Sequence, residues 1–102
     1  MATFVFRLIA PRPTFAQDMN DEEREIMGRH AAHWRPRIDS GQMVIFGPVL
    51  DGTWSWGLGV VEADDEDELR AFAAQDPAVT SGTAKVELGT LLQGFVRPRP
   101  QP

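Results

Sequence analysis

His30 and Asp76 are the two side chains of this chain whose chemistry best suits proton transfer. A histidine has an ordinary pKa of about 6.5, so its ring can both give and take a proton near neutrality. An aspartate beside one ring nitrogen can fix the tautomer and stabilise the imidazolium. The two residues are distant in the sequence, so the fold has to bring them together before an acid–base pair exists.

Nucleophilic chemistry has weaker support. The chain contains no cysteine, and Ser40, Ser55 and Ser81 lie outside any nucleophile-elbow motif. We therefore favour proton abstraction, in an elimination or isomerisation of a small molecule, over covalent catalysis. The structural alternative is that His30 bonds only a backbone carbonyl and that Asp76, which precedes a proline, only ends a helix. A carboxylate is disfavoured at a helix C-terminus, which indicates a further partner for this aspartate.

A metal site built on His30 is a further alternative. His33 follows three residues later, and Glu23 or Glu25 could add a carboxylate ligand. The two rings diverge on a helix and no third ligand is evident, so we predict neither a metal nor an organic cofactor.

Several other side chains could hold a substrate. Arg7 could bind a carboxylate, or it could form a salt bridge with Glu87 or Asp76. Trp54 and Trp56 could line an aromatic pocket, although paired tryptophans on one strand face are more often core or interface residues. The expected substrate-binding set is Arg7, His33, Trp34, Gly47, Pro48, Trp54 and Trp56.

The elements that must position these residues follow from the hydrophobic pattern. We predict a strand over 3–9, a helix from residue 20 to 39–41, strands over 42–46 and 54–61, a helix over 65–76 and a strand over 83–88. A capping box of Asn20 with Glu23 begins the first helix, and Pro36 should kink or stop it near Arg35. Gly47-Pro48 is expected to form a turn at the end of the second strand.

One face of the first helix carries the apolar residues Met27, Ala31, Trp34 and Ile38. At about 100° per residue, His30 lies roughly 70° from the centre of this stripe and His33 roughly 130°. We expect His30, at the edge of the stripe, to reach the space between the helix and the sheet.

The order of elements is strand, helix, strand, strand, helix, strand. It predicts an α+β domain of the ferredoxin-like βαββαβ type, with two helices on one face of a four-stranded antiparallel sheet. The other sheet face would carry large apolar side chains, which are unfavourable in water. We therefore expect a homodimer in which two sheet faces pair. The domain should span residues 1–92, and an extended proline-rich tail should follow over 93–102.

The composition limits the partners. With a formal net charge of −5 and no basic stripe, the chain of 102 residues is not expected to bind nucleic acid. No segment has the length of a membrane span. The lack of cysteine fits the reducing cytoplasm, which is the expected location. Besides a second copy of the chain, the expected partner is a small organic ligand bound near His30 and Asp76.

These residues also resemble a known family. The matching positions are His30, Trp34, Gly41, Phe46-Gly47-Pro48-Val49, Asp51, Gly52, Trp54 to Val61, Asp76-Pro77 and Gly82. In order and spacing they resemble the YCII-related family, over about residues 3–89. The resemblance implies a dimeric α+β barrel and an active site made by a histidine of the first helix and an aspartate at the end of the second. These are His30 and Asp76 here. Related barrels include isomerases and lyases of small cyclic compounds.

Three functions stay open at this point. The leading hypothesis is a small homodimeric enzyme in which His30 is the acid or base and Asp76 orients it. The first rival is a non-catalytic ligand-binding or accessory dimer that uses the same cleft. The second is a structural dimer whose interface is filled by Trp54 and Trp56.

Two features depart from the family pattern. One is the second histidine, His33, and the other is the segment 89–92, which lacks a Pro-Met ending.

Overall fold

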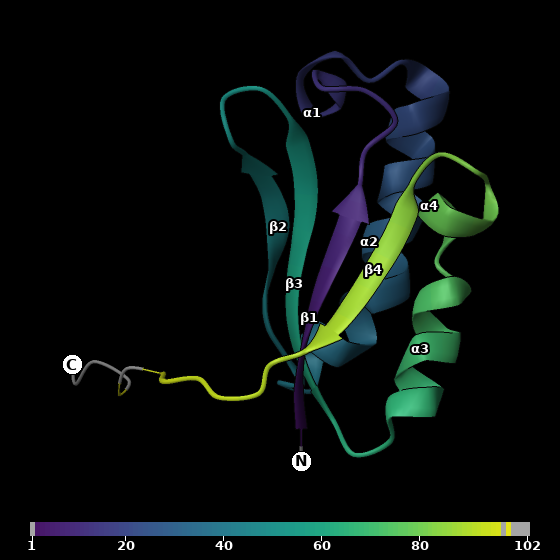
Figure 1. Cartoon of the computed structure of the whole chain (residues 1–102). Helices are drawn as coiled ribbons and strands as arrows, with labels where there is room; N and C mark the ends of the chain where they lie inside the picture. The colour runs from purple at the N-terminus through teal and green to yellow at the C-terminus, as the bar shows by residue number, and fades with distance from the viewer. Residues whose placement is uncertain (1, 97, 99–102) are drawn as a thin grey trace.

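The computed structural model describes residues 2–96 and 98. In chain order its elements are β1 (Ala2–Ile9), α1 (Phe15–Asp18), α2 (Asp21–Asp39), β2 (Met43–Leu50), β3 (Ser55–Ala63), α3 (Glu66–Ala74), α4 (Pro77–Thr80) and β4 (Lys85–Thr90). The strands form one antiparallel sheet in the order β2-β3-β1-β4. Figure 1 shows α2 and α3 gathered on one side of this sheet. The predicted ferredoxin-like α+β fold is confirmed.

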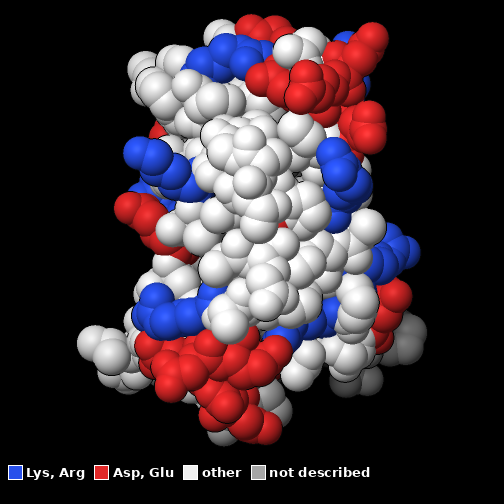
Figure 2. Space-filling model, turned by 90° about the vertical axis from the view of Figure 1, so that its right-hand side faces the viewer, with Lys and Arg blue, Asp and Glu red and all other residues white. Residues whose placement is uncertain are grey.

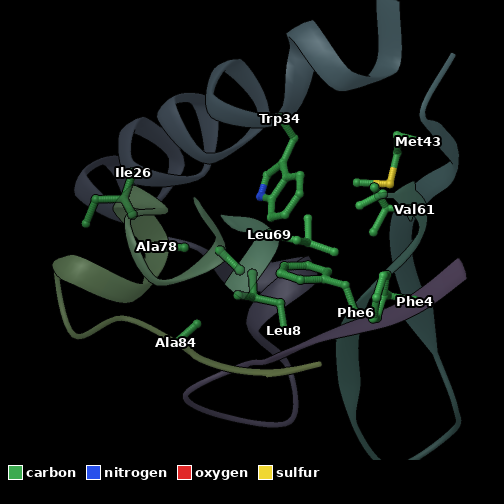
Figure 3. Close-up of a cluster of buried hydrophobic side chains, with 12 residues drawn as sticks. Phe4, Phe6, Leu8, Ile26, Trp34, Met43, Val61, Leu69, Ala78 and Ala84 are labelled. Atoms are coloured by element: carbon green, nitrogen blue, oxygen red, sulfur yellow. The ribbon is translucent and has the colours of Figure 1, made fainter. Parts of the chain in front are cut away.

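The side of the sheet that faces the helices forms the core. On β1, Phe4, Phe6 and Leu8 alternate toward this side and are at most 3% exposed. Trp34 of α2 is fully buried, and the centroid of its ring lies 4.9 Å from that of Phe6. Figure 3 shows these side chains grouped with Val61 between α2 and the strands. Aromatic and aliphatic contacts therefore fix α2 on the sheet.

The buried face of α2 differs from the predicted one. Ile26, His30 and Trp34 are buried, whereas Ala31 is exposed and Met27 is half-buried. The buried stripe is therefore rotated, and His30 lies on it rather than at its edge. The prediction counted only apolar residues, but a histidine can occupy a core position when a buried partner bonds its ring.

Two predicted boundaries around the hairpin are wrong. Strand β2 continues through Gly47 and Pro48 to Leu50, so the expected turn at these two residues does not form. A proline is tolerated there because β2 is an edge strand of the sheet. Trp54 lies before β3 begins, in a turn where its backbone N–H donates to Asp51 at 2.8 Å.

The first long helix is confirmed together with its cap. The Asn20 side chain accepts from the Glu23 N–H at 2.8 Å, and the Glu23 carboxylate accepts from the Asn20 N–H at 2.9 Å. Helix α2 continues through Pro36 to Asp39, so a stop near Arg35 is excluded. The short helix α1 is missing from the prediction, because four residues are too few to give a periodic pattern.

The opposite side of the sheet is uncovered in the single chain. The register pairs Val5 with Val60 and Arg7 with Leu58, at positions that point away from the helices. Val5, Leu58 and Val60 are half-buried and Arg7 is exposed. We call this surface the open sheet face. It is largely apolar around one arginine.

The charge distribution on the rest of the surface can be compared with the expectation that the chain does not bind nucleic acid. On the side that Figure 2 shows, acidic residues gather at the two ends of the molecule with a mainly uncharged band between them. That side offers no continuous basic surface to a phosphate backbone. Within the described residues, no helix is long and apolar enough to cross a membrane. Of the expected tail, residues 97 and 99–102 lie outside the described part of the chain.

Gly28 offers a test of how α2 is stabilised. It lies inside the helix, is exposed, and would have no heavy atom within 4 Å of an added Cβ. Gly28→Ala should raise the free energy of unfolding by about 0.5–1 kcal/mol, because alanine loses less backbone entropy in a helix. Urea denaturation measures the change. Gly41 has equally open surroundings but a φ of +85°. Gly41→Ala should therefore lower the free energy of unfolding, and a stabilised Gly41 variant would contradict this explanation.

Candidate active site

The carboxylate of Asp76 is the centre of the candidate active site. The residue is 0% exposed. Its Oδ2 lies 2.5 Å from Nδ1 of His30 and accepts from Nε1 of Trp34 at 2.7 Å. Its Oδ1 accepts from the backbone N–H of Ala78 at 2.8 Å. The fold thus joins a histidine and an aspartate that are 46 positions apart in the sequence.

The local structure explains why an aspartate stands at this position. Helix α3 ends at Ala74, and the short helix α4 begins at Pro77 with Asp76 as its N-cap. Proline suits the first position of a helix, and a carboxylate is favoured beside the free N–H groups there. The expectation that this carboxylate stands at an unfavourable helix C-terminus is therefore wrong. One oxygen caps α4, and the other is left for the side chains of α2.

Hydrogen bonding keeps this carboxylate ionised. Burial on its own would raise the pKa of Asp76. The bonds from His30 and Trp34, the charge of the histidine and the bond from Ala78 act in the opposite direction and outweigh burial. The pKa of Asp76 therefore lies below its usual range.

The state of Asp76 fixes the tautomer of His30. An ionised carboxylate can only accept hydrogen bonds, so Nδ1 of the histidine carries a proton and donates it. Nε2 is then the nitrogen that can exchange a proton with another molecule. The ring is also held by aromatic contacts. It stacks on Phe6 at a centroid distance of 6.3 Å and meets Phe46 edge-on at 5.1 Å.

Nε2 of His30 reaches accessible space. It forms no hydrogen bond within the described residues. In that same part of the chain, every fully buried side-chain nitrogen or oxygen has a hydrogen-bond partner. Nε2 is therefore not fully buried, although the side chain is only 7% exposed. The protein fixes one ring nitrogen and leaves the other open, as a general base requires.

An apolar pocket of about 240 Å³ lies next to residues that surround this histidine, although neither His30 nor Asp76 is among the residues that line it. Met27, one turn before His30, and Phe46, which contacts its ring, both line the pocket. The other walls come from β1, β3 and the segment between β1 and α2. Among the residues that the structure describes, no charged side chain lines it. Such a pocket suits an uncharged organic molecule.

The expected substrate-binding residues are only partly at this pocket. Gly47, Pro48 and Trp56 line it, although the Trp56 ring contacts the Arg7 guanidinium on the open sheet face. Trp34 is fully buried and donates to the carboxylate of the site, so its position suits orientation of the acid rather than contact with a ligand. Trp54 is 38% exposed and lies outside the pocket lining.

His33 and Arg7 have partners elsewhere. The Nε2 atom of His33 lies 2.8 Å from the carbonyl oxygen of Phe72, and the two rings stack at 4.0 Å. His33 thus joins α2 to α3. Arg7 lies on the open sheet face, where its guanidinium is 3.6 Å from Glu87 and 4.8 Å from the centroid of the Trp56 ring. The expected salt bridge with Glu87 is present, and binding of a substrate carboxylate by Arg7 stays a prediction.

Several pocket residues are absent from the sequence prediction. Phe15 and Met19 come from the loop that contains α1, and Phe46 comes from β2. An isolated phenylalanine after a proline-rich stretch indicates burial, but nothing in the pattern shows that the loop folds over the pocket.

The alternative of a metal held by His30 and His33 gains no third ligand from the structure. Within the described residues, no group of three or more His, Asp or Glu side chains is placed to hold a metal ion.

Asp76→Asn tests the role of the buried charge. At pH 7 it should lower the free energy of unfolding by about 3 kcal/mol or more, because buried donors lose an ionised acceptor. The pKa of Asp76 is lowered by folding. The charge therefore stabilises the fold above its ordinary pKa of about 4, and this stabilisation is lost as the pH falls through the folded pKa. The difference between wild type and variant should shrink accordingly.

Urea unfolding at a series of pH values measures this difference. Asp64→Asn, at an exposed position, is the matched control and should change stability little at any pH. A destabilisation by Asp76→Asn that does not depend on pH would contradict the assigned charge state.

Comparisons with known proteins agree with this architecture. Residues 3–90 match the sequence profile of the YCII-related domain. The 5-chloro-2-hydroxyhydroquinone dehydrochlorinase of Burkholderia phenoliruptrix AC1100, solved in complex with 2,5-dihydroxybenzoquinone, is similar with a TM-score of 0.65 and 19% identity. The likeness covers 92% of this chain and 96% of that one.

A second solved structure has the same fold. SnoaB, a cofactor-independent oxygenase of Streptomyces nogalater, has a TM-score of 0.50 and 19% identity, over 96% of this chain and 97% of its own. The comparison with curated proteins found no match. At this identity the two structures establish the fold alone, which is the ferredoxin-like α+β arrangement described above.

The profile covers the whole sheet with its helices, including both residues of the buried pair. The likeness to solved structures and the strand order agree with it. The chain belongs to the YCII-related family.

Proposed function

We propose that this chain is a small-molecule enzyme in which His30 and Asp76 act as an acid–base pair. One observation carries the proposal. Nδ1 of the histidine is 2.5 Å from a buried carboxylate, while Nε2 forms no hydrogen bond within the described residues and is not fully buried. A histidine with a purely structural role would more commonly have both nitrogens satisfied inside the protein. The apolar pocket, which shares Phe46 with the surroundings of this ring, offers a place for the ligand.

The proposed reaction begins with proton transfer to Nε2 of His30. The proton comes from an acidic carbon or hydroxyl group of the bound ligand, and Asp76 stabilises the imidazolium that forms. In an elimination, the electron pair of the broken C–H or O–H bond forms a double bond and the leaving group departs as an anion with the electrons of its own bond. The imidazolium then releases the proton to solvent. In an isomerisation, the imidazolium returns the proton to another atom of the ligand. Trp34 and the N–H of Ala78 keep the carboxylate ionised throughout.

The ligand proposed for this site is a small cyclic compound. The pocket lacks charged lining residues and is bounded by aromatic and aliphatic side chains such as Phe15, Phe46 and Met27. The similar dehydrochlorinase is named for a reaction of a chlorinated, hydroxylated ring. Chlorinated and hydroxylated rings are therefore the first compounds to test.

A non-catalytic ligand-binding module is the second candidate. It is favoured by the position of His30, whose side chain is only 7% exposed and is not part of the pocket lining. On this alternative, a ligand fills the apolar pocket without exchanging a proton with Nε2.

We also propose that the chain forms a homodimer through its open sheet face. Val5, Leu58 and Val60 are only half-buried there, and pairing two such faces would remove their apolar surface from water. The fold shared with the dimeric α+β barrels supports this arrangement.

His30→Ala and His30→Asn test the proposed reaction. Both should reduce turnover by at least about 100-fold, because neither side chain can exchange a proton at the position of Nε2. The asparagine amide can still donate to Asp76, so this variant should keep the fold. Ring absorbance and chloride release, measured on a panel of chlorinated and hydroxylated rings, report turnover. His33→Gln is the matched control and should stay within about threefold of wild type.

Two outcomes would count against this function. Full turnover in His30→Asn would exclude the histidine as the acid or base. Binding of the compounds without turnover by the wild type would favour the non-catalytic module.

Leu58→Glu tests the proposed dimer. Light scattering at micromolar concentration should give the wild type twice the chain mass of 11.3 kDa, and the variant a single chain mass. A buried, unpaired carboxylate at the centre of the interface makes association unfavourable. Ala71→Glu, at an exposed position of α3, should leave the dimer intact. A monomeric wild type would contradict the assignment of this interface.

A further inference from the structure

The segment 10–20, between β1 and α2, forms the outer wall of the apolar pocket. Ala10, Phe15, Ala16 and Met19 of this segment line the pocket. Its regular structure is limited to the four residues of α1, so few backbone hydrogen bonds hold it in place. The position of the outer wall must therefore depend on side chains that tie it to the rest of the fold.

Arg12 ties the outer wall to α2. Its guanidinium makes a two-pronged contact with the Glu23 carboxylate, at 2.7 and 2.8 Å, and its Nε donates to Asp18 at 2.9 Å. Glu23 belongs to the capping box of α2, so its side chain is itself oriented. The bond from Arg12, followed by that from the Asn20 backbone, lowers the pKa of Glu23 to about 2. The contact thus persists as a charged pair over the ordinary pH range.

Ser55 ties the same wall to β3. Its N–H and its hydroxyl each lie 3.1 Å from the carbonyl oxygen of Pro13, and both donate to it. The backbone N–H of Ala16 donates to the hydroxyl oxygen at 3.3 Å. Ser55 is 2% exposed and begins a core strand, so it is a rigid anchor. The outer wall is therefore fixed to two separate elements, α2 and β3, and each of them also contributes residues to the pocket lining.

We propose that Arg12 and Ser55 determine ligand specificity by holding the outer wall at a fixed distance from the sheet. The proposal rests on the proposed function, in which this pocket binds the ligand. An apolar cavity of about 150 Å³ holds benzene, so a pocket of about 240 Å³ has room for a second ring. With the wall fixed, the pocket takes an uncharged compound of one or two rings and excludes larger ones.

Fluorescence titration with two neutral probes tests this specificity. The probes are 2-naphthol, with two fused rings, and 1-hydroxypyrene, with four. Wild type should bind 2-naphthol at least about tenfold more tightly. Arg12→Ala, Glu23→Gln and Ser55→Ala should reduce this preference to about threefold or less. Glu23→Gln is the mildest change, since its amide oxygen can still cap α2.

Hydrogen–deuterium exchange gives a readout that needs no ligand. The N–H groups of Gln17 and Asp18 donate to the carbonyl of Thr14 within the outer wall. They should exchange at least about tenfold faster in Arg12→Ala, while β1 exchanges as in wild type. Arg29→Ala is the matched control, because its loose pair with Glu25 at 3.9 Å does not involve the wall. It should change neither the exchange nor the ring preference.

Three results would overturn the proposal. The first is an unchanged preference for 2-naphthol over 1-hydroxypyrene in both Arg12→Ala and Ser55→Ala. The second is unchanged hydrogen exchange of Gln17 and Asp18 in Arg12→Ala, and the third is that the wild type binds the two probes equally or binds neither. None of these measurements depends on turnover, so failure of the proposed reaction would be seen separately in the His30 variants.

Discussion

The buried carboxylate of Asp76 is the constraint on which the rest of the site depends. It is 0% exposed, and an unpaired charge at that depth would cost several kcal/mol. Its donors are His30 and Trp34 of α2 and the backbone of α4. The two helices must therefore dock in one arrangement that brings all three donors to the same carboxylate. That arrangement also orients the His30 ring, so the interaction that orders the core prepares the proposed base.

The two faces of the sheet have different roles in the proposed function. The helix-facing side carries the core, the acid–base pair and the apolar pocket, while the open sheet face is left for the proposed partner chain. Arg7 belongs to the proposed dimer interface, because it lies on the open sheet face beside Glu87. The outer wall, residues 10–20, encloses the apolar pocket on the helix-facing side. It is held by the polar side chains of Arg12 and Ser55 in addition to the buried ring of Phe15.

The sequence was sufficient to predict the four strands and the two longer helices. It was insufficient for the short helix α1 and for the pocket. Strand alternation and the capping box of Asn20 are local signals, which is why β1 and the start of α2 are confirmed. The contact of His30 with Asp76 came from a family resemblance, since no local pattern links residues so far apart. The outer wall depends on long-range bonds such as that from Ser55 to Pro13, which leave no periodic trace in the sequence.

The most direct test of this account is the protonation of the His30 ring, read from ¹⁵N chemical shifts of histidine-labelled protein at neutral pH. Ionised Asp76 requires the proton on Nδ1, with Nε2 unprotonated whenever the ring is neutral. We predict this tautomer in the wild type and its loss in Asp76→Ala. A neutral ring with its proton on Nε2, and with Nδ1 free, would mean that the carboxylate does not hold the histidine. The proposed acid–base pair would then be wrong.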